Sequence, residues 1–451
     1  MGRRRNKLSD EPFEVDIISL DSKAMGTALH KEKKLRVFDA LPGEKVLVRN
    51  LFGRSRRGMA ETLEVLQASD QRTQALCPHF GYCGACSLQH MSLDAQLALK
   101  QEGLLRHLEE NGQVQPQEVY TPLSGSQWNY RRKARLSVRD VAAKERVLVG
   151  FRERDGRYVA DMNECHILRQ EIADVLPQLA KLIEQLDCRR QIPQLEVACG
   201  DEQSALIIRH LEDLSEQDRN HLRAFATETG IGIYLQSAGP DSVCLLAPDD
   251  FGLEYTLPDS GLRFRFEPLD FTQINGPLNR KMVSRALELL DPQADDHVLD
   301  LFCGLGNFTL ALATRAGQVT GVEGSQEMVE RGADNARLNK LSNVSFHAVN
   351  LYEKPATEHE TALWPDGDYS SILLDPPRSG ALELLPSIAA SGVSKLLYIS
   401  CNPQTLARDA GLLVNEYGFE LKGAGILDMF PHTPHSEAIA LFERSTKEPA
   451  S

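Results

Sequence analysis

The stretch that decides the fold is His297-Val-Leu-Asp-Leu-Phe-Cys-Gly-Leu-Gly-Asn-Phe-Thr-Leu-Ala-Leu-Ala313. Its first six residues have the pattern of a buried parallel strand, and a helical pattern follows the two glycines. Glycines in such a turn let the backbone approach a ligand closely. The alternation of strand and helix patterns continues from about 271 to 442, which is typical of a doubly wound sheet with a ligand at its carboxyl edge.

The residues around this turn indicate the kind of cofactor. Glu323 ends the next strand pattern about twenty residues on, where an acid accepts hydrogen bonds from ribose hydroxyls. The third glycine of a dinucleotide fingerprint and the Lys-Ser/Thr pair of a P-loop are both missing, so no pyrophosphate cradle is evident. The turn resembles motif I of S-adenosylmethionine (AdoMet) methyltransferases. That resemblance implies cofactor contacts from Gln273, Phe302, Asn307, Glu323 and Asn350.

A second motif, Asp375-Pro-Pro-Arg378, follows the strand pattern Ile372-Leu-Leu. Asp/Asn-Pro-Pro at this point recurs in enzymes that methylate nucleobases, and the prolines stiffen the loop. Asp375 is therefore expected to accept a hydrogen bond from the cofactor or from the edge of a base. Its alternative role is to cap the loop.

Cys401 directly follows the strand pattern Lys395–Ser400 and is a candidate nucleophile. C5 of uracil is a poor nucleophile until a thiolate adds to C6, and a base must later remove the C5 proton. Glu437, at the start of the last strand pattern, is the candidate base, and His432 and His435 compete with it. We expect Arg408 or Arg378 to lower the pKa of Cys401. The alternative for Cys401 is a buried thiol with a packing role only.

Four motifs together carry a family resemblance. They are Phe-x-Gln-x-Asn, Asp-Leu-Phe-Cys-Gly-x-Gly-Asn-Phe-Thr, Ser-Cys-Asn-Pro-x-Thr-Leu-Ala-Arg-Asp and Met-Phe-Pro-His-Thr-x-His-x-Glu, in this order between Phe271 and Glu437. As a set they resemble the RNA 5-methyluridine (m5U) methyltransferase family. The resemblance implies that Cys401 is the nucleophile and that Glu437 abstracts the proton.

The N-terminal half contains a cysteine cluster, Cys77-x5-Cys83-x2-Cys86. Such spacing lets three thiolates converge on one metal, and Cys165 is the best candidate for a fourth ligand, ahead of Cys188 and Cys199. Spacing alone does not choose between zinc and an iron–sulfur cluster. The match to a branch of the family that acts on 23S ribosomal RNA implies a [4Fe–4S] cluster on Cys77, Cys83, Cys86 and Cys165.

The predicted fold class is multidomain α/β. Residues 13–68 have a small all-β pattern, in which a predicted strand Phe13–Leu20 is followed by a turn region at Met25-Gly26. Residues 1–70 are therefore expected to form an OB-like barrel, and they resemble a TRAM domain. A central mixed α/β domain with the iron–sulfur cluster covers residues 71–270, and a Rossmann-like AdoMet methyltransferase domain covers residues 271–451. The pattern from Leu93 to Asn111 predicts a helix.

Charge and composition bear on the partner. The chain has 451 residues and a net charge of −14, yet residues 1–60 carry 14 Lys and Arg against 8 Asp and Glu. The run from Trp128 to Arg139 holds five positive charges and no negative one, and a local patch governs attraction to phosphate. We expect RNA contacts from Arg131, Arg132, Lys133 and Arg135. Trp128, Tyr130 and Phe271 are candidates for stacking on unpaired bases.

The leading prediction is a uracil-C5 methyltransferase that uses AdoMet and acts on 23S ribosomal RNA. No apolar run is long enough to span a membrane and no secretory signal pattern is present, so a cytoplasmic location is expected. The protein is also expected to be a monomer without an obligatory protein partner. Two alternatives stay open. One is the same fold acting on another RNA uracil, in 23S or transfer RNA, or on cytosine C5. The other is a non-catalytic iron–sulfur RNA-binding factor.

Overall fold

The computed structural model describes residues 11–51, 56–352 and 364–444. The chain forms two compact units. The first unit runs to Ala98 and also includes Gly150–Met162 and Phe430–Pro434. The second unit comprises Leu99–Val149, Asn163–Met429 and the chain from His435 onward. These units are not continuous in sequence, and the predicted division at residues 70 and 270 stays a prediction.

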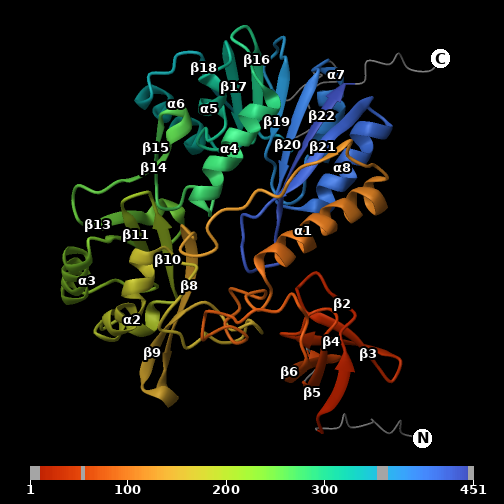
Figure 1. Ribbon diagram of the computed structural model, residues 1–451. Helices are drawn as coiled ribbons and strands as arrows, with labels where there is room; N and C mark the ends of the chain where they lie inside the picture. The colour runs from red at the N-terminus through yellow and green to blue at the C-terminus, as the bar shows by residue number, and fades with distance from the viewer. Residues whose placement is uncertain (1–10, 52–55, 353–363, 445–451) are drawn as a thin grey trace, which may run out of the picture. The chain divides into compact units, whose positions relative to one another are not determined.

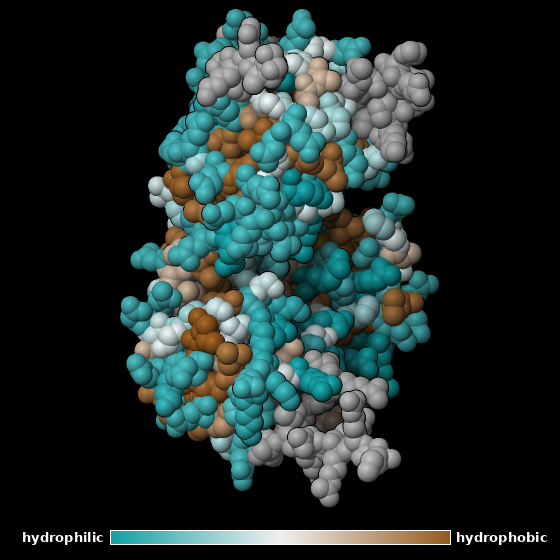
Figure 2. Space-filling model, turned by 90° about the vertical axis from the view of Figure 1, so that its right-hand side faces the viewer, coloured by the Kyte–Doolittle hydropathy of each residue, from teal (hydrophilic) through white to brown (hydrophobic). Residues whose placement is uncertain are grey.

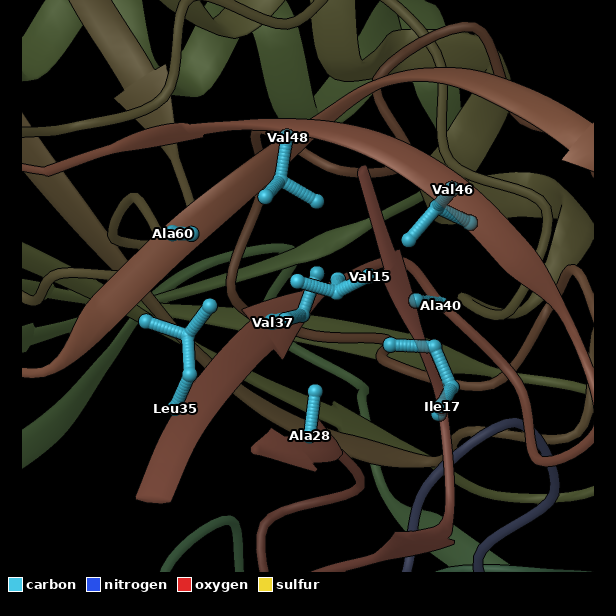
Figure 3. Packing of buried hydrophobic residues seen from close by; sticks show 9 residues of the cluster. All are labelled: Val15, Ile17, Ala28, Leu35, Val37, Ala40, Val46, Val48 and Ala60. Atoms are coloured by element: carbon cyan, nitrogen blue, oxygen red, sulfur yellow. The ribbon is translucent and has the colours of Figure 1, made fainter. Parts of the chain in front are cut away.

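A six-stranded sheet forms the N-terminal part of the first unit. Its strands are β1 (Phe13–Asp16), β2 (Ser19–Leu20), β3 (Gly26–His30), β4 (Lys33–Phe38), β5 (Lys45–Asn50) and β6 (Met59–Gln67), in the spatial order β1-β5-β6-β4-β3-β2. Alternate residues turn inward, and the apolar side chains of nine residues point toward one another (Figure 3). The small all-β pattern over residues 13–68 therefore agrees with the described residues.

Two details of this sheet differ from the sequence pattern. The predicted strand Phe13–Leu20 is interrupted, because Ile17 N donates to Glu44 O at 2.8 Å and Ile18 N donates to Thr27 O at 2.8 Å. The segment Gly26–His30, expected to begin as a turn, is a strand. Gly26 is required at its start, since a Cβ there would lie 2.9 Å from Ala40 O.

Helix α1 (Leu93–His107) is followed by a π-helical turn, Leu108–Gly112, which confirms the helix predicted from Leu93 to Asn111. The turn packs on helix α8 (Pro403–Asn415) of the second unit. A Cβ on Gly112 would lie 2.4 Å from Ala407 O, so only glycine allows this close approach.

A six-stranded mixed sheet forms the central part of the second unit. Its strands are β8 (Lys133–Val141), β9 (Arg146–Gly150), β10 (Gln194–Cys199), β11 (Ser204–Arg209), β12 (Gly232–Gln236) and β13 (Val243–Ala247), in the order β13-β12-β11-β10-β8-β9. Helices α2 (Gln170–Glu184) and α3 (Glu216–Thr229) accompany it, and a hairpin of β14 (Leu253–Leu257) and β15 (Leu262–Phe266) follows. The mixed α/β character predicted for this region is confirmed.

The site is built on an eight-stranded sheet, seen in the upper part of Figure 1. Its spatial order is β18 (Val344–Ala348), β17 (Gln318–Glu323), β16 (His297–Leu301), β19 (Ser371–Leu374), β20 (Lys395–Ser400), β22 (Glu437–Arg444), β21 (Phe419–Leu427) and β7 (Glu118–Val119). The first five strands are parallel, and β22 is antiparallel to both β20 and β21. The doubly wound sheet expected from the sequence is confirmed, with β7 added from outside the predicted catalytic domain.

Helices follow the strands of this sheet in the expected alternation. They are α4 (Gly276–Leu290), α5 (Thr309–Ala313), α6 (Gln326–Leu338), α7 (Leu385–Ala390) and α8. Asparagine or serine side chains cap three of them at the N-terminus: Asn275 for α4, Ser325 for α6 and Asn402 for α8. The cap of α8 matters for the site, because Asn402 directly follows Cys401.

No helix in the described ranges is long and apolar enough to cross a bilayer. Hydrophilic residues cover most of the face shown in Figure 2, with smaller hydrophobic areas among them.

Candidate active site

The turn after β16 is a ligand cradle by its backbone geometry. Phe302, Gly304 and Gly306 have positive φ angles of 64°, 56° and 93°. Phe302 is strained in this conformation, which non-glycine residues rarely adopt, and such strain is concentrated at functional sites. Gly304 N and Ser325 N each donate to the Glu323 carboxylate at 3.1 Å. The turn therefore fixes Glu323 at the end of β17, where the sequence predicted a ribose acceptor.

Asp300 is a buried acid beneath this turn. Thr309 Oγ1 donates to its Oδ2 at 2.6 Å, whereas Oδ1 has no hydrogen-bond partner in the part of the chain that the structure describes. Burial, with smaller contributions from Asp375 and Glu323, raises the pKa of Asp300 to about 7. This carboxyl oxygen is therefore free to accept a further hydrogen bond.

The other predicted cofactor residues lie at the same edge of the sheet. Phe302, Glu323, Asn350 and Asp375 all stand at or just beyond the carboxyl ends of neighbouring parallel strands, where α/β folds bind ligands. Asn350 is exposed and accepts a hydrogen bond from Tyr352 N at 3.1 Å. The rings of Phe302 and Tyr352 lie 5.7 Å apart, centroid to centroid.

Gln273 and Asn307 are held in place by neighbouring side chains. Gln273 Nε2 donates to Asp375 Oδ2 at 3.3 Å, which joins the segment before α4 to the loop after β19. Asn307 Oδ1 accepts from Tyr255 OH at 3.0 Å and from Asn279 Nδ2 at 2.9 Å. The structure thus brings the cofactor candidates to one region.

The register of two antiparallel strands brings Cys401 and Glu437 together. Ser400, the last residue of β20, pairs with Ala438 of β22. Cys401 follows Ser400 and Glu437 precedes Ala438, so in this antiparallel pair the two residues lie opposite each other at the strand ends. Leu374 of β19 pairs with Tyr398 of β20, which places Asp375 at the same edge. Cys401 is half-buried and Glu437 is buried.

Burial and mutual repulsion raise the pKa values of the acids and the thiol in this group. Burial, and next the neighbouring Asp375, raises the pKa of Glu437 to about 8. Burial raises the pKa of Asp375 to about 7. Burial and the charges of Glu437 and Asp375 raise the pKa of Cys401. Burial and the neighbouring acids together outweigh the positive charge near the site, so these pKa values stay raised until a cationic ligand enters.

The expected lowering of the pKa of Cys401 is therefore wrong for the ligand-free protein. Arg378 does act in the lowering direction, on both Cys401 and Glu437, but burial and the two carboxyl groups outweigh it. Arg408 has no such effect, because its guanidinium pairs with Asp409 at 2.7 Å and donates to Ser379 O at 2.9 Å.

The competing bases, His432 and His435, lie outside the strand pairing that places Glu437. His435 belongs to the same unit as Cys401, and burial together with Arg378, Lys100 and Arg131 lowers its pKa. His432 belongs to the other compact unit. Of the three candidate bases, Glu437 is the one whose position follows directly from pairing with the strand that carries the thiol.

The basic run divides into buried and exposed residues. Arg132 is buried, forms an ion pair with Asp201, and lies so close to Gly276 that a Cβ there would be 2.2 Å from its guanidinium. Lys133 Nζ donates to Pro268 O at 2.5 Å, and burial lowers its pKa to about 8. Arg135 is exposed and pairs with Glu196 at 3.1 Å.

Arg131 is partly buried, and its Nε donates to Lys133 O at 3.0 Å. Two of the three aromatic candidates differ sharply in exposure: Tyr130 is buried and Phe271 is 70% exposed. Arg132 continues the buried face of β8, on which Ala134 and Leu136 lie. Lys133 and Arg135 are two residues apart on the other face, and they differ because the side chain of Lys133 bonds to Pro268 O.

Sequence reasoning did not predict several contacts that shape the site. They are the buried acceptor Asp300, the bonds of Tyr255 and Asn279 to Asn307, and the internal ion pair of Arg132, which was expected to contact RNA. Asp300 had a local signal, since it ends the strand before the glycine turn. The others had none, because their partners lie far away in the sequence.

The predicted metal ligands fall into both compact units. Cys77, Cys83 and Cys86 belong to the first unit, and Cys165 belongs to the second. Cys83 N donates to His79 O at 2.8 Å and Phe80 N donates to Cys77 O at 3.1 Å, so the segment is wound into tight turns. No group of three or more Cys, His, Asp or Glu side chains within residues 11–51, 56–352 and 364–444 is arranged to hold a metal ion.

Comparison with known proteins agrees with this geometry. Residues 92–445 match the family model described as tRNA (Uracil-5-)-methyltransferase. The 23S rRNA (uracil(1939)-C(5))-methyltransferase RlmD of Alkalilimnicola ehrlichii is 47% identical over 99% of this chain and 100% of its own length. Proteins of the same name from Xanthomonas euvesicatoria and Hahella chejuensis are each 46% identical, over 98% and 99% of this chain and all of their own length.

A solved structure shares the fold. The tRNA (uracil-54, C5)-methyltransferase of Pyrococcus abyssi, in complex with S-adenosyl-L-homocysteine, superposes with a TM-score of 0.72. The match covers 95% of this chain and 100% of that one at 22% sequence identity.

Proposed function

Because the chain belongs to the tRNA (uracil-5-)-methyltransferase family, we propose that it methylates C5 of a uracil in 23S ribosomal RNA, with AdoMet as methyl donor. The target would be the position that its relatives' names give as uracil 1939. The observation that carries this proposal is the pairing of Ser400 with Ala438, which sets Cys401 and Glu437 at one strand edge. Matches of 46–47% identity over nearly the full length of relatives named for 23S rRNA favour ribosomal over transfer RNA.

The chemistry follows from these two side chains. The Cys401 thiolate adds to C6 of the uracil, and the ring electrons make C5 nucleophilic. AdoMet, when bound, supplies the electrophilic methyl group and a positive sulfonium charge. After C5 has gained the methyl group, Glu437 takes the proton from C5. The C5=C6 double bond re-forms as the bond from Cys401 to C6 breaks, so the thiolate is regenerated.

The site fits this cofactor by charge. Asp300 presents an orphaned oxygen, and Asp300, Asp375 and Glu437 all have raised pKa values. A cation entering the site stabilises the ionised carboxylates and the Cys401 thiolate. Cofactor binding is thereby coupled to activation of the nucleophile and of the base.

We expect AdoMet binding to release protons. The carboxyl pKa values of about 7 to 8 leave these groups partly protonated at neutral pH, and a bound cation lowers them. AdoMet affinity should therefore rise from about pH 5 to about pH 8. Calorimetry at pH 7 in two buffers of different ionisation enthalpy measures the protons released.

S-adenosyl-L-homocysteine, which lacks the sulfonium charge, is the matched ligand and should release fewer protons. Asp300→Asn should reduce the release with AdoMet. Proton uptake, or an equal release with both ligands, would contradict this coupling.

We propose that Arg135 and Arg131 contact RNA, whereas Arg132 and Lys133 stabilise the fold. Arg135→Ala should weaken RNA binding and reduce the salt dependence by about one phosphate contact. Arg132→Ala should leave RNA contacts intact but lower the free energy of unfolding by about 2–4 kcal/mol, since Asp201 loses a buried partner. RNA titrations at several salt concentrations and urea unfolding of both variants measure the two effects. Loss of salt dependence in Arg132→Ala without loss of stability would reverse the assignment.

The exposed ring of Phe271 lies two residues from Gln273. An exposed aromatic group at the rim of a site that must receive an unstacked base is suited to stacking on RNA. We propose this role for Phe271, and not for the buried Tyr130.

We also propose that Cys77, Cys83, Cys86 and Cys165 bind a [4Fe–4S] cluster and that residues 1–70 form a TRAM domain. The support is the Cys77-x5-Cys83-x2-Cys86 spacing and, for Cys165, the type of cluster and the TRAM domain, the resemblance to the 23S ribosomal RNA branch of the family. Protein purified without oxygen should contain about four irons and four sulfides, and Cys165→Ser should lose them while Cys244→Ser should not. Stoichiometric zinc in place of iron would contradict the proposal. Monomeric state and cytoplasmic location stay predictions.

The decisive test of the function uses 23S RNA fragments that carry 5-fluorouridine. Fluorine at C5 cannot leave as a proton, so the enzyme should stall as a covalent adduct on Cys401 when AdoMet is present. Transfer RNA with the same substitution is the control. An adduct with transfer RNA alone would support the alternative substrate, and no adduct with folded, AdoMet-binding protein would refute the thiol mechanism.

A further inference from the structure

The loop that follows Asp375-Pro-Pro is held by four hydrogen bonds to the start of α8. Asn402 Nδ2 donates to Arg378 O at 3.0 Å, and Thr405 Oγ1 donates to the same oxygen at 3.3 Å. Arg408 Nη2 donates to Ser379 O at 2.9 Å. Ala381 N donates to Asp409 Oδ2 at 2.9 Å. The residues that make these bonds to the loop lie in the N-terminal half of α8, except Asn402, which caps the helix.

We name these four residues the α8 clamp: the cap Asn402 and, within α8, Thr405, Arg408 and Asp409. Asp409 anchors the clamp in the core: it is fully buried and accepts a hydrogen bond from Tyr398 OH at 2.7 Å and one from Arg408 Nε at 2.8 Å. A charge-assisted network of this kind is rigid because each member is satisfied.

The loop is shaped to fit the clamp. Gly380 N donates to Pro377 O at 2.9 Å, and Gly380 has a φ angle of +82°. A Cβ on Gly380 would lie 2.6 Å from Asp409 Oδ2 and 2.7 Å from Arg408 Nη2, so only glycine allows this approach. The prolines before the loop and the clamp after it fix its course at both ends.

The side chain that this loop presents is Arg378. Its residue is exposed, and its guanidinium forms no ion pair with any residue of the described ranges. It is nevertheless the positive group that acts on Cys401, Glu437 and His435 alike. The groups that face Cys401 are thus two acids, Glu437 from β22 and Asp375 after β19, and one base, Arg378.

We propose that the α8 clamp is a positioning device that holds Arg378 toward Cys401, with Arg408 and Asp409 as positioning residues for the nucleophile. The proposal rests on the proposed function, in which Cys401 attacks the base. Cys401 immediately precedes Asn402, so a single hydrogen bond, from Asn402 to Arg378 O, ties the backbone of the nucleophile to that of the arginine. The clamp explains why the Thr-Leu-Ala-Arg-Asp part of the motif follows the cysteine.

The test is the pH dependence of Cys401 alkylation by iodoacetamide in protein without RNA or AdoMet. Mass spectrometry follows the tryptic peptide from Leu396 to Arg408, which contains Cys401 as its one cysteine. Arg378→Gln should slow alkylation at pH 8 by about three- to tenfold by removing the positive charge that favours the thiolate. Arg378→Lys should restore most of the rate.

The clamp variants separate positioning from charge. Thr405→Val and Arg408→Lys leave Arg378 in the chain, yet each should slow alkylation by about two- to threefold because the loop is held less firmly. Arg408→Lys keeps its positive charge and its trypsin site. Arg337→Gln, on the exposed face of α6, is the matched control and should react like the unmodified protein.

The outcomes are distinct from those of the function test. An Arg378→Gln variant that reacts at the original rate overturns the electrostatic role, and normal rates in both clamp variants overturn the clamp. Circular dichroism of each variant excludes unfolding as the cause. If the 5-fluorouridine adduct fails to form while these shifts are seen, the proposed function fails and the positioning of Arg378 still stands.

Discussion

Replacing Cys401 by alanine is expected to lower the rate of methylation by about 10⁴-fold or more, since the reaction then lacks the covalent step that activates C5. AdoMet binding should persist, because four of the expected cofactor residues lie at the ends of β16, β17, β18 and β19, whereas the thiol follows β20. Transfer of a labelled methyl group to 23S RNA fragments measures the rate, and calorimetry measures the binding.

The matched control is Cys244→Ala, which removes an exposed cysteine from β13. It should methylate at the rate of the unmodified protein. Substantial methylation by Cys401→Ala would show that the thiol packs and does not attack, and would shift the chemistry to an acceptor that needs no covalent activation.

Replacing Glu437 by glutamine is expected to trap the enzyme on natural RNA. Addition of Cys401 and methyl transfer need no base after the thiolate has formed, whereas release of the thiol needs removal of the C5 proton. Turnover should fall by about 10²- to 10⁴-fold, and a covalent complex of methylated RNA and protein should accumulate. Denaturing gels of reactions with unsubstituted 23S fragments and AdoMet reveal the complex.

Glu443→Gln, on the same strand and paired with Lys422 at 3.9 Å, is the control and should give no such complex. His435→Gln tests the competing base and should retain turnover. A covalent complex in His435→Gln and none in Glu437→Gln would exchange the two roles.

The pH dependence of stability tests the raised pKa of Glu437 independently of the reaction. Its pKa is raised to about 8 in the folded protein, so folding binds a proton, and this contribution to stability is present at low pH and lost as pH rises through about 8. Glu437→Gln has no such proton to lose. Its stability relative to the unmodified protein should therefore increase between about pH 5 and pH 9, and urea unfolding at several pH values measures the change. A difference that does not vary with pH would show that the carboxyl is ionised in the folded protein.

Local sequence was sufficient to predict those strands, helices and turns whose pattern lies within a single element. The strand Lys395–Ser400, the start of β22 at Glu437 and the helix from Leu93 follow from hydrophobic periodicity and are found as predicted. The glycine turn was likewise recognisable, because glycine adopts positive φ angles without strain and other residues do so only rarely. These features depend on neighbours within a few residues, so no tertiary partner is needed to identify them.

Charge and burial could not be predicted in this way. The basic run around Arg132 was expected to face RNA as a whole, but a strand turns alternate residues inward, and Asp201, almost seventy residues away, was not visible as a partner. Arg408 was expected to act on the thiol, yet Asp409 and Ser379 hold its guanidinium. Which cation meets which anion depends on distances that the order of residues does not contain.

By itself, then, the sequence determined the doubly wound sheet and the glycine turn, because short-range periodicity and backbone preference encode them. It also supplied Cys401 and Glu437 as candidates for the thiol and the acid, through the resemblance of their motifs. Only the tertiary structure decided how these groups are charged. Pairing of β20 with β22 buries Glu437 beside Asp375 and Cys401, and that shared burial raises all three pKa values. The physical reason is that desolvation and charge coupling act through space, between residues that only folding brings together.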